Sequence, residues 1–139
     1  MNPHLRLIAS ELAVRAPAGE AGAKDDPRAP RFELSFACRE DWQAGLGRLI
    51  LPLECSIAEP QSFQGSAVVG RLRGRTLAEL RMDASRLTRR QAHIVAGDSA
   101  LVQVLWLLSG RCRVQQGPNR PMLEAGGWTI LDPGREYAL

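Results

Sequence analysis

The chain has 139 residues, 45% apolar and 24% charged, with a formal net charge of +3 at pH 7. This size and composition predict one globular domain, and so small a positive excess does not by itself indicate nucleic-acid binding. The three cysteines lack close spacing, which argues against a disulfide framework or zinc knuckle and favours a reducing cytoplasm. No apolar run reaches the ~18 residues of a membrane helix, so no membrane partner is expected.

Residues 1–31 are predicted to form an N-terminal arm and a flexible linker. Leu5, Ile8 and Leu12 fall at helical spacing, which indicates either a short amphipathic helix or a frayed terminus with helical tendency. Residues 16–31 are rich in Pro, Gly and Ala and contain almost nothing to bury, as is typical of a linker. The folded domain is therefore expected to span residues 32–139.

The domain is predicted to begin with one helix and to continue as short strands. Trp42, Leu46 and Leu49 share one face of a helix over residues 39–49, with acidic residues in its first turn. From there the apolar period becomes two, and turn signals recur about every ten residues. The candidate strands cover residues 51–57, 65–74, 76–83, 101–109, 111–116, 121–124 and 128–131. This pattern is typical of an antiparallel sandwich or jelly roll.

Alternation also predicts which side chains face the core in two of these strands. In residues 65–74 the predicted inward face contains Val68, Gly70 and Leu72. In residues 76–83, one face carries Ala78, Leu80 and Met82.

Residues 101–116 carry the strongest strand signal. The first part is almost continuously apolar, which predicts a strand buried on both faces. In the second part apolar and polar residues alternate, which predicts a partner strand with one solvent-exposed face. A tight turn at Gly110 is expected to join the two strands. One face of the first strand carries Gln103, Leu105, Leu107 and Ser109, and the other carries Val102, Val104, Trp106 and Leu108.

The sequence offers no catalytic residue, metal site or cofactor motif. His4 and His93 lie far apart without acids at metal spacing, so His93 is predicted to be a core or rim residue that finds a hydrogen bond. Nucleophile elbows, phosphate loops and dinucleotide fingerprints are absent from the sequence. The arginines between Arg71 and Arg90 are interpreted as a solvated face, because acids interrupt them and no aromatic residues interleave. Arg89 and Arg90 are also candidates to orient a loop or a partner subunit.

A ligand cavity is one interpretation of the strand over residues 101–109. If this strand lines a small barrel, Gln103 and Ser109 among apolar neighbours would orient a small organic molecule. The alternative is that both side chains satisfy backbone groups inside a filled core. Trp106 and Trp128 are further candidates to flank a ring of the ligand.

The order of several motifs resembles the N-terminal, cupin-like sensor domain of AraC/XylS-type transcriptional regulators, over roughly residues 36–139. The motifs are Leu51-Pro52-Leu53-Glu54, Gly70-Arg71-Leu72, Leu87-Thr88-Arg89-Arg90, Leu107-Leu108-Ser109-Gly110-Arg111 and Leu123-Glu124-Ala125-Gly126-Gly127-Trp128. Two departures stand out. The turn acid common in the family is missing at Gly127, and the sequence stops at Leu139, before any helix-turn-helix unit.

The resemblance implies a mainly β, metal-free, cupin-like double-stranded β-helix with one or two short N-terminal helices. It implies a small organic effector as partner, with Ser109 and Tyr137 lining the pocket beside Gln103, Leu105 and Leu107. A homodimer is a second partner to consider, and DNA would be bound only through a C-terminal domain absent from this chain. The expected function is a non-enzymatic sensor of a bacterial, cytoplasmic regulator. The alternatives are a ligand-free interaction module, a small metal-independent cupin enzyme, and DNA binding by this chain alone.

Overall fold

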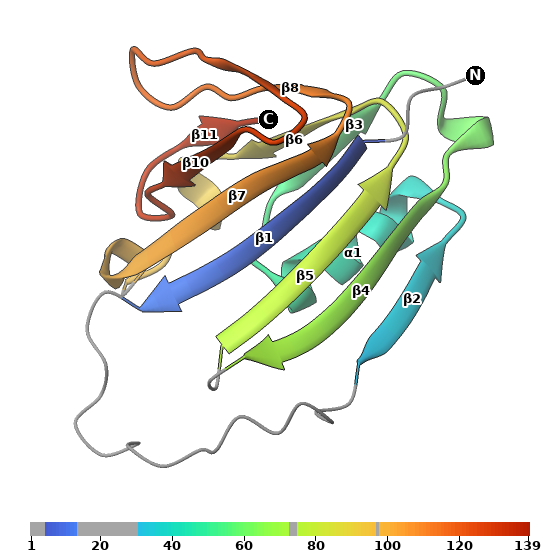
Figure 1. Cartoon of the computed structure of the whole chain (residues 1–139), viewed down its shortest axis with the longest axis horizontal. Helices are drawn as coiled ribbons and strands as arrows, with labels where there is room; N and C mark the ends of the chain where they lie inside the picture. Colours follow the sequence, from blue (N-terminus) through green and yellow to red (C-terminus); the bar gives the residue numbers. More distant parts are fainter. Residues whose placement is uncertain (1–4, 14–30, 73–74, 97) are drawn as a thin grey trace.

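The computed structural model describes residues 5–13, 31–72, 75–96 and 98–139 (Figure 1). Within these residues there is one α-helix, α1, which spans Arg39–Leu49, and three short 3-10 helices occupy Pro60–Ser62, Gln91–His93 and Asp98–Ala100. The strands are β1 (Leu5–Ala13), β2 (Phe32–Phe36), β3 (Glu54–Ile57), β4 (Gly65–Leu72), β5 (Arg75–Met82), β6 (Ser85–Arg89), β7 (Leu101–Ser109), β8 (Arg111–Arg113), β9 (Met122–Glu124), β10 (Trp128–Leu131) and β11 (Tyr137–Ala138). This mainly β architecture with one helix confirms the predicted fold class.

The strands form one large antiparallel sheet and two smaller ones. The large sheet has six strands in the order β10-β7-β1-β5-β4-β2, and α1 lies behind its β5, β4 and β2 side (Figure 1). The second sheet has the order β11-β6-β3, and β8 pairs with β9 as a separate hairpin. The core lies between the large sheet, α1 and the smaller sheets, as in a cupin-like β-sandwich.

The prediction of a helix at the N-terminus is wrong, because residues Leu5–Ala13 form strand β1. This strand lies between β5 and β7, with Ile8 opposite both Glu79 and Trp106. Pairing with β5 over Leu5–Ser10 and with β7 over Arg6–Ala13 satisfies most of the backbone groups of the strand, and such tertiary pairing overrides a weak local helical preference. The arm is thus part of the main sheet, whereas residues 14–30 of the expected linker lie outside the described residues.

Helix α1 occupies the predicted residues and buries the predicted face. Trp42 is 0% exposed and Leu46 1% exposed, and the Trp42 ring meets Phe36 edge to face at a centroid distance of 5.4 Å. The acids Glu40 and Asp41 stand in the first turn, where the helix dipole favours negative charge. The amphipathic pattern and the charge placement therefore specify this helix together.

The inward face agrees with prediction in β5 but not in β4. Ala78, Leu80 and Met82 of β5 belong to the core as predicted. In β4, however, Ala67 is fully buried and Val69 packs against the core, so the predicted face with Val68 was one residue out of register. The physical reason is that β4 carries small and apolar residues on both faces, which leaves its alternation ambiguous.

Strand β7 is buried on one face only. Gln103, Leu105 and Leu107 are buried, whereas Trp106 on the other face is 48% exposed. The prediction of burial on both faces is therefore wrong, because α1 and the smaller sheets all lie on the inner side of the large sheet. The core cluster comprises Trp42, Leu46, Leu53, Cys55, Phe63, Ala67, Ala78, Leu80, Met82, Leu87, Leu105, Leu107, Cys112, Val114, Leu123, Leu131 and Tyr137.

Candidate effector site

A polar pair lies inside the apolar core, where β7 and β11 face each other. The Tyr137 hydroxyl donates a hydrogen bond of 2.7 Å to Oε1 of Gln103, and both side chains are about 3% exposed. Burial raises the pKa of Tyr137 to about 12, so the phenol keeps its proton at neutral pH and remains a donor. The pair gives the interior a defined hydrogen-bonding group among Leu105, Leu107 and other apolar neighbours.

A buried ion pair stands beside this polar pair. Arg89 is opposite Tyr137 in the β6–β11 pairing, and its guanidinium is 2.5 Å from Oδ2 of Asp98. The same guanidinium donates to the carbonyls of Pro52 and Pro133, at 2.6 and 3.0 Å. Three partners from three separate segments thus meet this one side chain, which is 0% exposed. Arg89 therefore fixes the loops that surround the interior.

Sequence analysis placed Arg89 in a solvated arginine run and so missed its burial, although it raised loop orientation as a role. The available signal was the alternation of β6, which puts Arg89 on the same face as the core residue Leu87. His93 does find a hydrogen bond, as predicted, because its Nδ1 accepts from the backbone N–H of Arg90 at 3.0 Å.

A small hollow of about 220 Å³, called the barrel-end hollow below, opens at one end of the interior. It is lined by Met82, Ser85, Leu87, Arg111, Cys112, Arg113 and Leu139. Met82, Leu87 and Cys112 are core residues, so the hollow has an apolar floor. Burial raises the pKa of Cys112 to about 11, which keeps this thiol neutral at pH 7. Cys112 is thus the buried hydrophobe that the sequence indicates and not an activated nucleophile.

The hollow lies at the same pairing of β6 with the C-terminal segment that holds Tyr137. Leu87 and Leu139 exchange backbone hydrogen bonds of 2.9 and 3.0 Å, and they lie two residues along from Arg89 and Tyr137. Two residues of a strand span about 7 Å, which a tyrosine side chain or a small ligand can bridge. Tyr137 is two residues along the chain from Leu139, and neither Gln103 nor Tyr137 lines the hollow.

The two tryptophans named from the sequence lie elsewhere. Trp106 and Trp128 are paired neighbours on β7 and β10, 48% and 64% exposed, on the outer face of the large sheet. The structure therefore brings Gln103, Leu105, Leu107 and Tyr137 into the interior and leaves the tryptophans outside it. Ser109 is half-buried at the end of β7.

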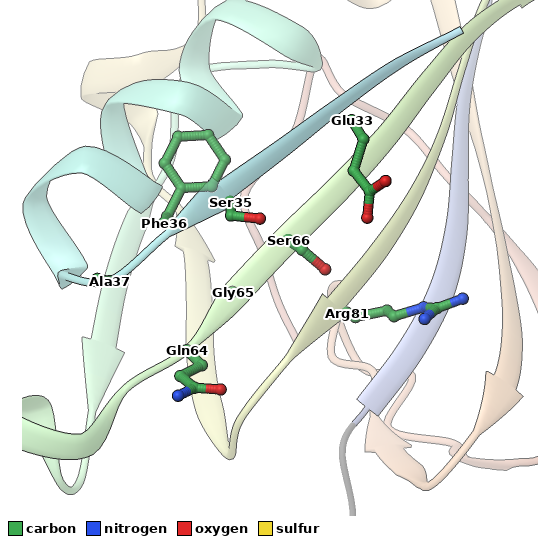
Figure 2. Close-up of a pocket in the computed structure, with 8 residues that line it drawn as sticks. All are labelled: Glu33, Ser35, Phe36, Ala37, Gln64, Gly65, Ser66 and Arg81. Atoms are coloured by element: carbon green, nitrogen blue, oxygen red, sulfur yellow. The ribbon is translucent and has the colours of Figure 1, made fainter.

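A second, wider hollow of about 580 Å³ lies on the outer face of the large sheet, across β2, β4 and β5. Ser35 pairs with Ser66, and Ser66 with Arg81, so a polar row crosses the three strands. Figure 2 shows Phe36 turned toward α1, whereas Glu33 and the polar row project from the other side. Arg81 also bonds Glu79 at 3.2 Å, as is usual on a solvated sheet face. Sequence analysis did not single out this hollow.

No three His, Cys, Asp or Glu side chains in the described part of the chain gather closely enough to hold a metal ion. Within the same residues, no helix has the length and apolar character needed to cross a membrane.

Comparison with known proteins identifies the family. Neither the comparison with curated proteins nor that with solved structures finds a match. The model of the AraC-binding-like domain matches residues 42–139, which run from Trp42 of α1 past β11 to the last residue described. The match therefore includes both members of the interior polar pair and every residue that lines the barrel-end hollow. The chain belongs to the AraC-binding-like domain family.

Proposed function

We propose that this chain is the effector-sensing domain of an AraC-type transcriptional regulator, and that it binds a small organic molecule without chemical turnover. The family supports a regulatory sensing role. The observation that carries the proposal is the buried Gln103–Tyr137 hydrogen bond, two residues along the chain from Leu139, which lines the barrel-end hollow. A buried amide and phenol among leucines can orient one ligand, and the neutral Cys112 thiol offers no nucleophile.

The proposed response is a shift between two arrangements of the interior. An effector that enters past Leu87 and Leu139 competes for the hydrogen bond between Tyr137 and Gln103. The effector then binds with different free energies when Tyr137 and Gln103 are hydrogen-bonded to each other and when they are apart. Only such a difference can shift a regulatory equilibrium. Arg89, which holds three segments around the interior, connects this change to the surface loops at Pro52 and Pro133.

A thermal-shift screen with sugars, aromatic acids, aldehydes and hydrocarbons tests the proposal. A ligand that binds only the folded state adds about 2.7 kcal/mol at a hundred times its dissociation constant, which raises the melting midpoint measurably. We expect Gln103→Leu and Cys112→Met, which change the polar pair and fill the hollow, to weaken a hit. Ile130→Thr, on the outer face of β10, is the control and should leave binding unchanged. A screen without saturable binding would contradict the proposal.

A second candidate function, a protein interaction module, is favoured by the outer face of β7 and β10. Trp106, Trp128 and Ile130 are 48%, 64% and 55% exposed there, and β10 is an edge strand. Exposed apolar side chains on an unpaired strand edge are typical of association surfaces. Light scattering at increasing protein concentration tests this function. Association that is weakened by Ile130→Thr and unaffected by ligands would favour it over effector sensing.

A further inference from the structure

The barrel-end hollow combines an apolar floor with a basic rim. We infer that the effector is a compact organic acid, whose apolar body packs on Met82, Leu87 and Cys112 and whose carboxylate meets Arg111 and Arg113. This inference rests on the proposed function, because it names the chemical class of ligand for the same interior. It follows from the composition, charge and size of the hollow.

The rim is basic because two arginines of β8 line the hollow on either side of Cys112. Arg111 and Arg113 are exposed on either side of Cys112, which is 5% exposed and points into the core. Both arginines line the hollow together with the inward thiol. Arg111 and Arg113 each carry a guanidinium group whose planar fork of N–H donors matches a carboxylate in geometry and charge.

Little on the protein competes for these guanidinium groups. Arg111 is 3.8 Å from Glu124, and the two side chains are 78% and 73% exposed, so this contact is weak and screened. Among the residues that the structure describes, Arg113 has no hydrogen-bond or ion-pair partner. Among the described residues, no acidic side chain lines the hollow. An incoming carboxylate would therefore displace at most one weak contact.

The remaining lining residues disfavour other ligand classes. A sugar needs several hydrogen-bonding side chains, but the only other polar side chain of the lining is Ser85, whose hydroxyl bonds Sδ of Met82 at 3.2 Å. A cationic ligand would be repelled by the two arginines. The volume of about 220 Å³ lies below the roughly 300 Å³ at which drug-sized sites begin, so the body of the ligand is one ring or a short chain.

Matched pairs of acids and amides test the inference by calorimetry at pH 7. Hexanoate and cyclohexanecarboxylate are compared with hexanamide and cyclohexanecarboxamide, which have the same shape without the charge. We expect the acids to bind about tenfold more tightly or better, as hydrogen bonds to charged groups allow. In Arg113→Gln that preference should fall to near parity, Arg113→Lys should retain part of it, and high salt should reduce it. Arg39→Gln, which removes an exposed arginine of α1 outside the hollow, is the matched control.

The outcomes separate this inference from the proposed function. Amides that bind as well as acids, or an acid preference that survives Arg111→Gln and Arg113→Gln together, would overturn the acid class while leaving a sensor domain. An equal loss in Arg39→Gln would also overturn it, because the effect would then be general electrostatics. If neither these probes nor the broader screen bind, the proposed function itself fails. The substituted residues Arg39, Arg111 and Arg113 are all exposed, so we expect each variant to fold. An unchanged melting midpoint checks this.

Discussion

The Tyr137 hydroxyl donates to Gln103 Oε1 at 2.7 Å, and this bond links the sheet that contains β11 to the large sheet that contains β7. The two residues are 34 positions apart and form a polar contact between buried side chains of the two sheets. A buried hydrogen bond of this kind specifies how two layers align, because any other alignment leaves a donor or an acceptor without a partner.

Removing both members of this pair should cost less unfolding free energy than the sum of the losses from removing each member alone. Tyr137→Phe leaves the Gln103 oxygen buried without its donor, and we expect a loss of about 1–3 kcal/mol in unfolding free energy. Gln103→Leu should cost a similar amount, and the double variant should cost less than the sum of the two. Urea denaturation of the four proteins measures the coupling. Strictly additive losses would show that the bond contributes nothing to stability.

The Arg89 network should dominate the stability of the loops around the interior. Arg89→Met leaves Asp98 buried without its partner and removes the donors to the Pro52 and Pro133 carbonyls. We expect a loss of about 3–5 kcal/mol in unfolding free energy, as for other broken buried ion pairs. Arg86→Met, an exposed position on the same strand, is the control and should change stability by less than about 0.5 kcal/mol. Similar losses in both variants would contradict the assigned role.

Two glycines of β4 should respond in different ways to an added methyl group. A Cβ at Gly65 would lie 2.8 Å from Cε3 of Trp42 and 3.0 Å from Cζ of Phe63, both in the core. Gly65→Ala should therefore destabilise the fold by about 1–3 kcal/mol through overpacking. At Gly70 the nearest atom is Arg31 Cγ at 3.8 Å, so Gly70→Ala should be neutral or slightly stabilising. Thermal melts compare the two variants directly, and an equal effect would disprove the steric argument.

The parts of the fold that sequence reasoning predicted are those with one unambiguous period. Trp42 and Leu46 mark a helical face, and Leu105 and Leu107 mark a strand face beside a fully apolar stretch. Gln103 was named because it interrupts that stretch, and the structure places it in the interior. These features depend on neighbours within a few residues, which a single sequence displays.

The missed features depend on contacts between distant segments. β1 is a strand because β5 and β7 pair with both of its edges, although the spacing of Leu5 and Leu12 alone suits a helix. Arg89 is buried because its partners arrive from residues 37, 9 and 44 positions away. The barrel-end hollow likewise combines residues from separate strands. No local pattern contains such information, so these features had to come from the structure.

Alkaline pH should destabilise the interior in a defined order. Burial raises the pKa of Cys112 and Cys55 to about 11 from their usual 9, and that of Tyr137 to about 12 from 10. Between the two values of each group, the folded state retains a proton that the unfolded state has lost. Stability is therefore fully present below pH 9 and decreases as the pH rises, first through the thiols and then above pH 10 through the phenol.

The Tyr137 contribution can be isolated with one substitution. For a mostly buried phenol with this shift, the loss between pH 10 and 12 is on the order of 2–3 kcal/mol. Tyr137→Phe has no titrating proton, so its unfolding free energy should start lower at pH 8 but decrease less steeply above pH 10 than that of the parent chain. Urea denaturation at pH values from 8 to about 11.5 provides both curves. Parallel curves above pH 10 would mean that the hydroxyl titrates as if it were in solvent, and would contradict its placement in the core beside Gln103.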